Sequence, residues 1–225
     1  MTDTNDAIAY ARDIIEGTIK SNKYIRLQCQ SFINDLDNPE DDLRWVFNYD
    51  LANHALSYMQ LFKQVEGVVA GQQIVMSPWQ AFIVANAFGW VDKEDQDVRR
   101  YTRIVSLVGR KNAKSTLLAV WALYELAYAP EGSQIVTMAT QREQAKLVWN
   151  LSGRMAETSD QRLIPMFNRT VSTIANKDNW NRYWPLSKES KRLDGLNIRL
   201  AIADEAAAIS NDDLFDVVTS SMGSQ

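Results

Sequence analysis

The chain has 225 residues and a formal net charge of −4, with a sequence pI near 5.1. Its overall charge therefore does not attract nucleic acid, and any contact with DNA must come from a local basic patch. Its one cysteine, Cys29, excludes an internal disulfide and fits a reducing compartment. Apolar runs fall short of the roughly 18 residues of a membrane span. The acidic N-terminus does not resemble a secretory signal, so we expect a cytosolic protein.

The first seventy or so residues are predicted to be helical. Apolar side chains recur at helical spacing over residues 8–19 and, more loosely, over residues 25–36. Asn38-Pro39 interrupts this pattern, and a third amphipathic helix is expected to start near Asp50, whose carboxylate can cap it. The sequence therefore predicts a helical N-terminal subdomain at residues 1–75.

From residue 76 the predicted elements alternate between strand and helix. Ser77-Pro78 has the cap and the first-turn proline of a short helix. Further elements are expected in the order strand 102–108, helix 114–129, strand 133–139, helix 141–158 and, after an irregular stretch, strand 198–203. Strands that alternate with helices of this length predict an α/β fold with a parallel sheet flanked by helices. We expect this domain to cover residues 76–225.

A basic loop lies between the first strand and the helix that follows it. Residues 108–116 read VGRKNAKST, which nearly spells the phosphate-binding loop G-x-x-x-x-G-K-[ST]. Val108 stands in place of the first glycine and Ala113 in place of the second. A strand before such a loop and a helix after it direct backbone N–H groups and the positive end of the helix dipole toward phosphates. An ordinary surface turn is the alternative interpretation of this motif taken alone.

The residues of the loop supply the candidate nucleotide contacts. They are Gly109, Arg110, Lys111, Asn112, Ala113, Lys114, Ser115 and Thr116. Lys114 can reach the β- and γ-phosphates, and the hydroxyl of Ser115 can hold Mg²⁺.

An acidic pair follows the last predicted strand. The segment RLAIADE is apolar until it ends in Asp204 and Glu205. Because ligands bind at the carboxyl ends of parallel strands, we expect Asp204 to lie beside the loop and to coordinate Mg²⁺ directly or through water. Glu205 is the candidate general base that polarises the attacking water. An isolated Asp-Glu pair can also be a helix cap, but together with the loop it predicts a nucleoside triphosphatase.

Four stretches in this order resemble the large terminase subunit of tailed phages of the lambdoid or HK97-like type. The stretches are PWQAF with FGW at 78–90, RKNAKST at 110–116, ATQREQA at 139–145, and LDGL followed by ADEAA at 193–207. Members of this family usually read RKNGKS at the loop, so Ala113 is a departure. Members of this family commonly lack the first glycine of the motif as well.

The resemblance implies a P-loop NTPase fold of the RecA/ASCE type and an ATPase motor that uses ATP and Mg²⁺. Trp79 and Gln80 would belong to the adenine-recognition segment, although Trp79 can instead be a packing residue. Arg110 would contact or sense the γ-phosphate. Arg192 is the candidate arginine given in trans to a neighbouring subunit, although Asp194 stands where some relatives carry that arginine.

The resemblance also implies a setting and a set of partners. The motor would translocate double-stranded viral DNA into a procapsid in the host cytoplasm, with no membrane involved. Its implied partners are double-stranded DNA, the portal protein of the procapsid, the small terminase subunit and further copies of itself in a ring. In isolation we expect a monomer.

Family members continue past the second acidic motif with another strand, a coupling motif and a nuclease domain. This sequence stops before them, so we expect a truncated ATPase portion with an incomplete sheet and no nuclease activity. Two other functions remain open. A superfamily-2 helicase lobe also has a glutamine motif, a phosphate loop and an Asp-Glu pair, and a non-hydrolysing nucleotide-binding scaffold protein would fit the substitution at Ala113.

Overall fold

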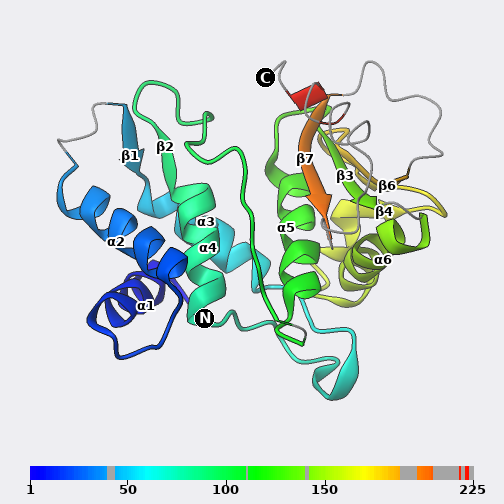
Figure 1. The fold of residues 1–225 in the computed structure, drawn as a ribbon. Coiled ribbons are helices and arrows are strands. Elements are labelled where there is room, and N and C mark those ends of the chain that lie inside the picture. Colours follow the sequence, from blue (N-terminus) through cyan, green and yellow to red (C-terminus); the bar gives the residue numbers. More distant parts are fainter. Residues whose placement is uncertain are drawn as a thin grey trace. The chain divides into compact units, whose positions relative to one another are not determined.

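The computed structural model describes residues 1–39, 44–109, 111–139, 142–187 and 197–204, together with Val218, Ser221 and Met222. The chain forms two compact units, each made from two segments of the sequence (Figure 1). Unit 1 comprises Met1–Gln60 and Ile74–Val108, and unit 2 comprises Leu61–Gln73 and Gly109–Gln225. The domain boundary expected after residue 75 stays a prediction.

Unit 1 consists of helices packed with a small antiparallel sheet. Its described elements are α1 (Thr4–Glu16), α2 (Lys23–Asp37), β1 (Trp45–Phe47), α3 (Tyr49–Met59), α4 (Pro78–Gly89) and β2 (Trp90–Asp92). Strands β1 and β2 pair antiparallel, with Val46 opposite Val91. The N-terminal region is therefore mostly helical, as predicted, but it is not helical throughout.

Side-chain caps define where the helices of unit 1 begin. The carboxylate of Asp3 accepts hydrogen bonds from backbone N–H groups of the first turn of α1, and Gly17 ends that helix with φ 86°. Asn22 caps α2 in the same way. Helix α3 is capped by Asn48 rather than by Asp50, which corrects the prediction. Asp50 lies within the first turn, where its negative charge still interacts favourably with the helix dipole.

Aromatic side chains fill the core of unit 1 around α4. The ring of Phe32 makes edge-to-face contacts with Phe47, Phe82 and Trp90 at centroid distances of 5.6, 5.3 and 6.2 Å. Gly89 ends α4 directly against this cluster. A Cβ atom at residue 89 would overlap the ring of Phe47, so the close approach of the helix to β1 requires glycine there.

Unit 2 contains a five-stranded sheet in the order β4-β5-β6-β3-β7. Its described helices and strands are α5 (Lys114–Tyr128), β3 (Gln134–Ala139), α6 (Arg142–Thr158), β4 (Phe167–Arg169), β5 (Ile174–Asn176), β6 (Arg182–Ser187) and β7 (Ile198–Ala203), with 3-10 turns at Gly67–Val69 and Ile164–Met166. The sequence predicted α5, β3, α6 and β7 to within a few residues.

The sheet is mixed, which corrects the expectation of a parallel sheet. Strand β3 pairs parallel with β6 and with β7, whereas β4, β5 and β6 pair antiparallel. The reason is the short connection between β4 and β5, where the hydroxyl of Thr170 accepts a hydrogen bond from the backbone N–H of Thr173. So short a turn can only reverse the chain, because a parallel pair needs a long crossover.

The strand expected at 102–108 is absent, which corrects a second prediction. Residues 101–109 have no regular secondary structure, and Val105 and Leu107 are 88% and 97% exposed. The β-branched and apolar residues of this segment favour a strand, but a strand forms only where another backbone pairs with its N–H and C=O groups. Among the described strands, β7 pairs on one side with β3 and has no neighbour on its other side.

The two faces of the sheet are covered differently. Helices α5 and α6 lie on one face, where Thr137 Oγ1 of β3 donates to the carbonyl of Ala145, and the indole N–H of Trp149 donates to the carbonyl of Tyr183 (Figure 1). The opposite face carries an apolar cluster of Val136, Met138, Leu186, Ile198 and Val218. This arrangement buries strand β3, which lies between β6 and β7, on both faces.

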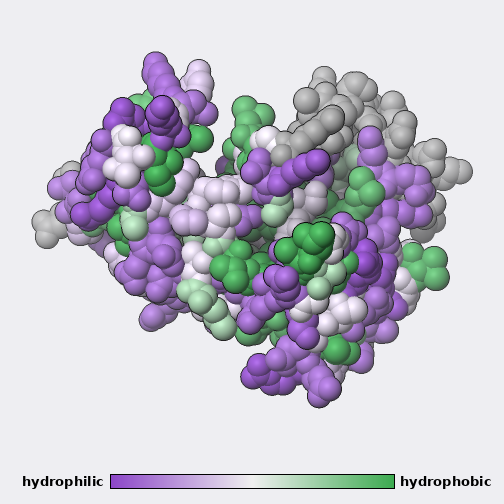
Figure 2. Space-filling view, turned by 90° about the horizontal axis from the view of Figure 1, so that it is seen from below, coloured by the Kyte–Doolittle hydropathy of each residue, from purple (hydrophilic) through white to green (hydrophobic). Residues whose placement is uncertain are grey.

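Hydrophobic residues lie among hydrophilic ones on the molecular face seen in Figure 2. Within the part of the chain that the structure describes, none of the helices combines the length and the apolar character that crossing a bilayer requires.

The packing of Gly89 against Phe47 leads to a first prediction. Gly89→Ala should lower the free energy of unfolding by about 1–3 kcal/mol, because the added methyl group forces the ring of Phe47 out of its aromatic cluster. Urea unfolding followed by far-UV circular dichroism measures the change. The penalty should shrink when Gly89→Ala is made in a Phe47→Leu background. An equal penalty in both backgrounds would show that Phe47 is not the obstacle.

Candidate functional site

The loop before α5 has an unusual backbone conformation. Lys111 and Ala113 both lie in the left-handed region, with φ 65° and 53°. The side-chain amide of Asn112 donates to the carbonyl of Gly109 at 3.1 Å, which closes the turn. Turns of this kind direct successive N–H groups to one side and form concavities that bind anions. Helix α5 then begins at Lys114, and its 15 residues add a dipole with its positive end at the loop.

Three side chains from two distant segments meet at the start of α5. The Lys114 ammonium lies 2.7 Å from Asp204 Oδ1, and the hydroxyl of Ser115 donates to Asp204 Oδ2 at 3.4 Å. Asp204 directly follows β7, at the carboxyl end of a parallel strand. The side chains of Lys114 and Asp204 are 33% and 21% exposed, so this group of charges is partly open to solvent.

The chemistry of this group fits a nucleotide with its cation. An ammonium group at a helix N-terminus can pair with phosphate, and a hydroxyl beside a carboxylate offers the oxygen ligands that Mg²⁺ prefers. Mg²⁺ typically takes one or two protein oxygens together with substrate phosphates and water. Ser115 and Asp204 are the residues that would hold it.

The remaining loop candidates surround this group. Gly109, Lys111, Asn112 and Ala113 are exposed, and Thr116 is half-buried in the first turn of α5. The exposed loop leaves its backbone accessible to a ligand. The contacts of these five residues with a nucleotide stay predictions.

The expected adenine-recognition residues lie in unit 1. Gln80 is only 6% exposed, and its Oε1 atom accepts hydrogen bonds from the backbone N–H and the hydroxyl of Ser77 at 2.9 and 2.8 Å. Gln80 therefore caps the first turn of α4, while Trp79 beside it is half-buried. Since the loop belongs to unit 2, the role of both residues at adenine stays a prediction.

Three candidates lie outside the described residues: Arg110, Arg192 and Glu205. Their roles as phosphate contact, trans-acting arginine and general base stay predictions.

The structure also reveals a charged pair that the sequence analysis did not single out. Arg199 Nε of β7 lies 3.8 Å from Glu125 Oε2 of α5, and Glu125 is 1% exposed. A signal was present, because Glu125 interrupts an otherwise apolar stretch of helix, LLAVWALYELAY. Its partner could not be read from the sequence, since the two residues are far apart along the chain.

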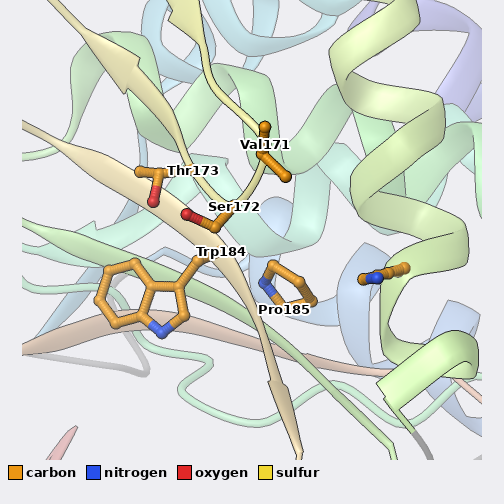
Figure 3. Close-up of a pocket in the computed structure, with 6 residues that line it drawn as sticks. Val171, Ser172, Thr173, Trp184 and Pro185 are labelled. Carbon is orange, nitrogen blue, oxygen red and sulfur yellow. The ribbon is translucent and has the colours of Figure 1, made fainter.

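A pocket of about 200 Å³ occupies another part of unit 2. It is lined by Lys146 of α6, by the turn between β4 and β5 and by Trp184 and Pro185 of β6 (Figure 3). The loop and Asp204 are not among its lining residues. The pocket is therefore separate from the predicted site.

Comparisons with known proteins identify relatives of this chain. The family model described as "Terminase large subunit, ATPase domain" matches residues 78–225. The large terminase subunit of Enterobacteria phage HK97 is 29% identical over 167 residues, which cover 70% of this chain and 31% of that protein. The crystal structure of the HK97 bacteriophage large terminase matches with a TM-score of 0.66 and 25% identity, over 77% of this chain and 35% of that one. The chain spans about a third of the length of these relatives.

Ala113 leads to a second prediction. A left-handed conformation strains alanine but not glycine, so Ala113→Gly should raise the free energy of unfolding by up to about 1 kcal/mol and preserve nucleotide affinity. Thermal unfolding measures the first effect and titration with a fluorescent ATP analogue the second. Ala127→Gly, within the same helix, is the control and should lower stability by roughly 0.5–1 kcal/mol. A loss of stability in Ala113→Gly would contradict the inference that the left-handed backbone at Ala113 is strained.

Proposed function

The chain belongs to the family of terminase large-subunit ATPase domains, and from this premise we propose that it is the ATP-hydrolysing portion of a phage motor that drives double-stranded DNA into a procapsid. The observation that carries the proposal is the meeting of Lys114, Ser115 and Asp204 at the start of α5. A cation, a hydroxyl and a carboxylate at that place are what a nucleotide with Mg²⁺ requires.

The ion pair of Lys114 with Asp204 suggests how this site accepts its charged ligand. In the structure each side chain neutralises the other at 2.7 Å. With ATP and Mg²⁺ bound, Lys114 would pair with the phosphates, and Asp204 and Ser115 would hold the cation. Chemically, the bound cation neutralises the charge that develops on the phosphates.

The remaining roles follow from the family pattern and from position along the chain. Glu205, next to Asp204, would polarise the attacking water. Arg110 would contact the phosphates from the loop, and Arg192 would act on the site of a neighbouring subunit. Trp79 and Gln80 would recognise adenine.

The proposed partners are double-stranded DNA, the portal protein of the procapsid, the small terminase subunit and further copies of the chain in a ring. The net charge of −4 does not favour DNA binding by the chain as a whole. The proposal therefore assigns DNA contact to local basic surfaces that assembly brings together.

Membership of the terminase family favours the motor over the helicase alternative. A non-hydrolysing scaffold protein would share the fold and the nucleotide contacts, so the distinction from it depends on measured chemistry.

A third prediction tests nucleotide binding. Lys114→Ala should weaken binding of a fluorescent ATP analogue roughly tenfold to hundredfold, because a charge-assisted hydrogen bond to phosphate contributes about 1.5–3 kcal/mol. Lys146→Ala on α6 removes a positive charge of unit 2 outside the site and serves as the control, with unchanged affinity expected. Equal affinity in the native chain and Lys114→Ala would support the alternative interpretation, in which the loop is an ordinary surface turn.

A fourth prediction separates binding from hydrolysis. Glu205→Gln should keep its affinity for ATP but lose at least about a hundredfold in the rate of single-turnover hydrolysis, because it keeps the shape of the side chain and removes the base. Asp204→Asn should instead weaken the part of the affinity that depends on Mg²⁺. Release of labelled phosphate under excess protein measures the rate. Hydrolysis at the native rate in Glu205→Gln would assign the base elsewhere, and a native chain that binds ATP without cleaving it would support the scaffold alternative.

A further inference from the structure

We propose that the buried ion pair of Glu125 and Arg199 is a positioning device, which fixes where α5 lies along β7 and thereby holds Lys114 and Ser115 at Asp204. The proposal deepens the function proposed above and rests on it. Glu125 lies eleven residues from Lys114 and Arg199 five residues from Asp204 along the chain, so both would act through the alignment of a helix with a strand.

The first observation is the burial of the pair. The side chain of Glu125 is 2% exposed and that of Arg199 is 20% exposed, with Arg199 Nε 3.8 Å from Glu125 Oε2. An ion pair removed from water adds little net stability, because the loss of hydration offsets the attraction between the charges. It does favour one geometry, because a displacement of α5 along β7 would separate Arg199 Nε from Glu125 Oε2 and lose their attraction. Such a pair therefore favours one alignment of α5 on β7 over its neighbours.

The second observation is a bulge that directs Arg199 toward α5. The pairing of β3 with β7 shifts between Gln134, opposite Ile198, and Ile135, opposite Leu200, so Arg199 is the extra residue. Strict alternation would place Arg199 on the same face as Ala201 and Ala203, which pack against the apolar cluster on the face away from the helices. The bulge breaks this alternation, and Arg199 instead reaches Glu125.

The third observation is the matched spacing of two ion pairs. Helix α5 and strand β7 run side by side in Figure 1. Glu125 lies eleven residues beyond Lys114 in α5, a rise of about 16 Å, and Arg199 lies five residues before Asp204, also about 16 Å of strand. The pair Lys114–Asp204 and the pair Glu125–Arg199 thus join the two elements at both ends. Moving α5 by one residue along β7 would rotate its side chains by about 100° and break both contacts.

The two pairs differ most at Lys114 and Glu125. The side chain of Lys114 is 33% exposed, so its ammonium can leave Asp204 for a phosphate. The side chain of Glu125 is 2% exposed, so its carboxylate has no such access to a ligand from solvent. The Glu125–Arg199 pair therefore keeps the alignment while the Lys114–Asp204 pair opens.

The test replaces both inner charges at once. Glu125→Leu with Arg199→Met exchanges the pair for apolar side chains of similar size, a change that commonly preserves stability. We expect native or higher melting temperature, roughly tenfold weaker binding of a fluorescent ATP analogue, and faster hydrogen exchange at the backbone amides of residues 114–118. Glu125→Gln alone removes the negative charge opposite Arg199 and should lower both the melting temperature and the affinity.

A matched control uses another ion pair of unit 2. Arg169 pairs with Glu157 at 3.2 Å and joins β4 to α6, so Glu157→Leu with Arg169→Met should leave nucleotide affinity and the exchange of residues 114–118 unchanged. A folded Glu125→Leu/Arg199→Met variant with native affinity and native exchange would overturn the proposal. Should the native chain bind no ATP, the proposed function fails, and the hydrogen-exchange comparison still decides whether the pair positions α5.

Discussion

The contact between Lys114 and Asp204 is the constraint on which the site depends, because it requires two elements to end at one place. Lys114 is the first residue of α5, and Asp204 follows the last residue of β7. Their meeting at 2.7 Å requires parallel strands whose carboxyl ends share one edge of the sheet, with a helix that starts at that edge. The mixed character of the sheet does not disturb this requirement, since the antiparallel strands β4 and β5 lie at the edge away from β7.

The elements that the sequence predicted well are those whose patterns are local. Helix α5 and strands β3 and β7 are mostly apolar runs, and burial on the sheet explains this composition. The segment 102–108 has the composition of a strand but lacks a paired neighbour. Pairing depends on a distant segment of chain, so propensity cannot determine it. The hairpin of β4 and β5 was not predicted for a different reason, because strands of three residues are too short to show a clear alternation.

The same contrast between local patterns and distant contacts applies to the residues of the site. The loop and Asp204 could be predicted because each carries its chemistry in a short stretch of sequence, and the structure brings Lys114, Ser115 and Asp204 together. The Glu125–Arg199 pair could not be predicted, because it depends on a bulge that turns one side chain to the other face. Gln80 shows the converse: its position in a family motif suggests adenine, whereas its amide oxygen caps α4.

Ala113 shows how this loop combines local strain with function. A glycine there would adopt φ 53° without penalty, but it would also add freedom to the loop. Alanine carries a modest cost in the left-handed region and keeps the side chain small where the proposed phosphate would approach. Such strain persists only where the surrounding structure determines the backbone conformation. Here the bond from Asn112 to Gly109 closes the loop on one side, and on the other α5 is held to β7 by its two ion pairs. Alanine in place of the motif's second glycine is therefore compatible with the proposed phosphate site. We infer that the contacts of α5, rather than a glycine, hold residue 113 in its left-handed conformation.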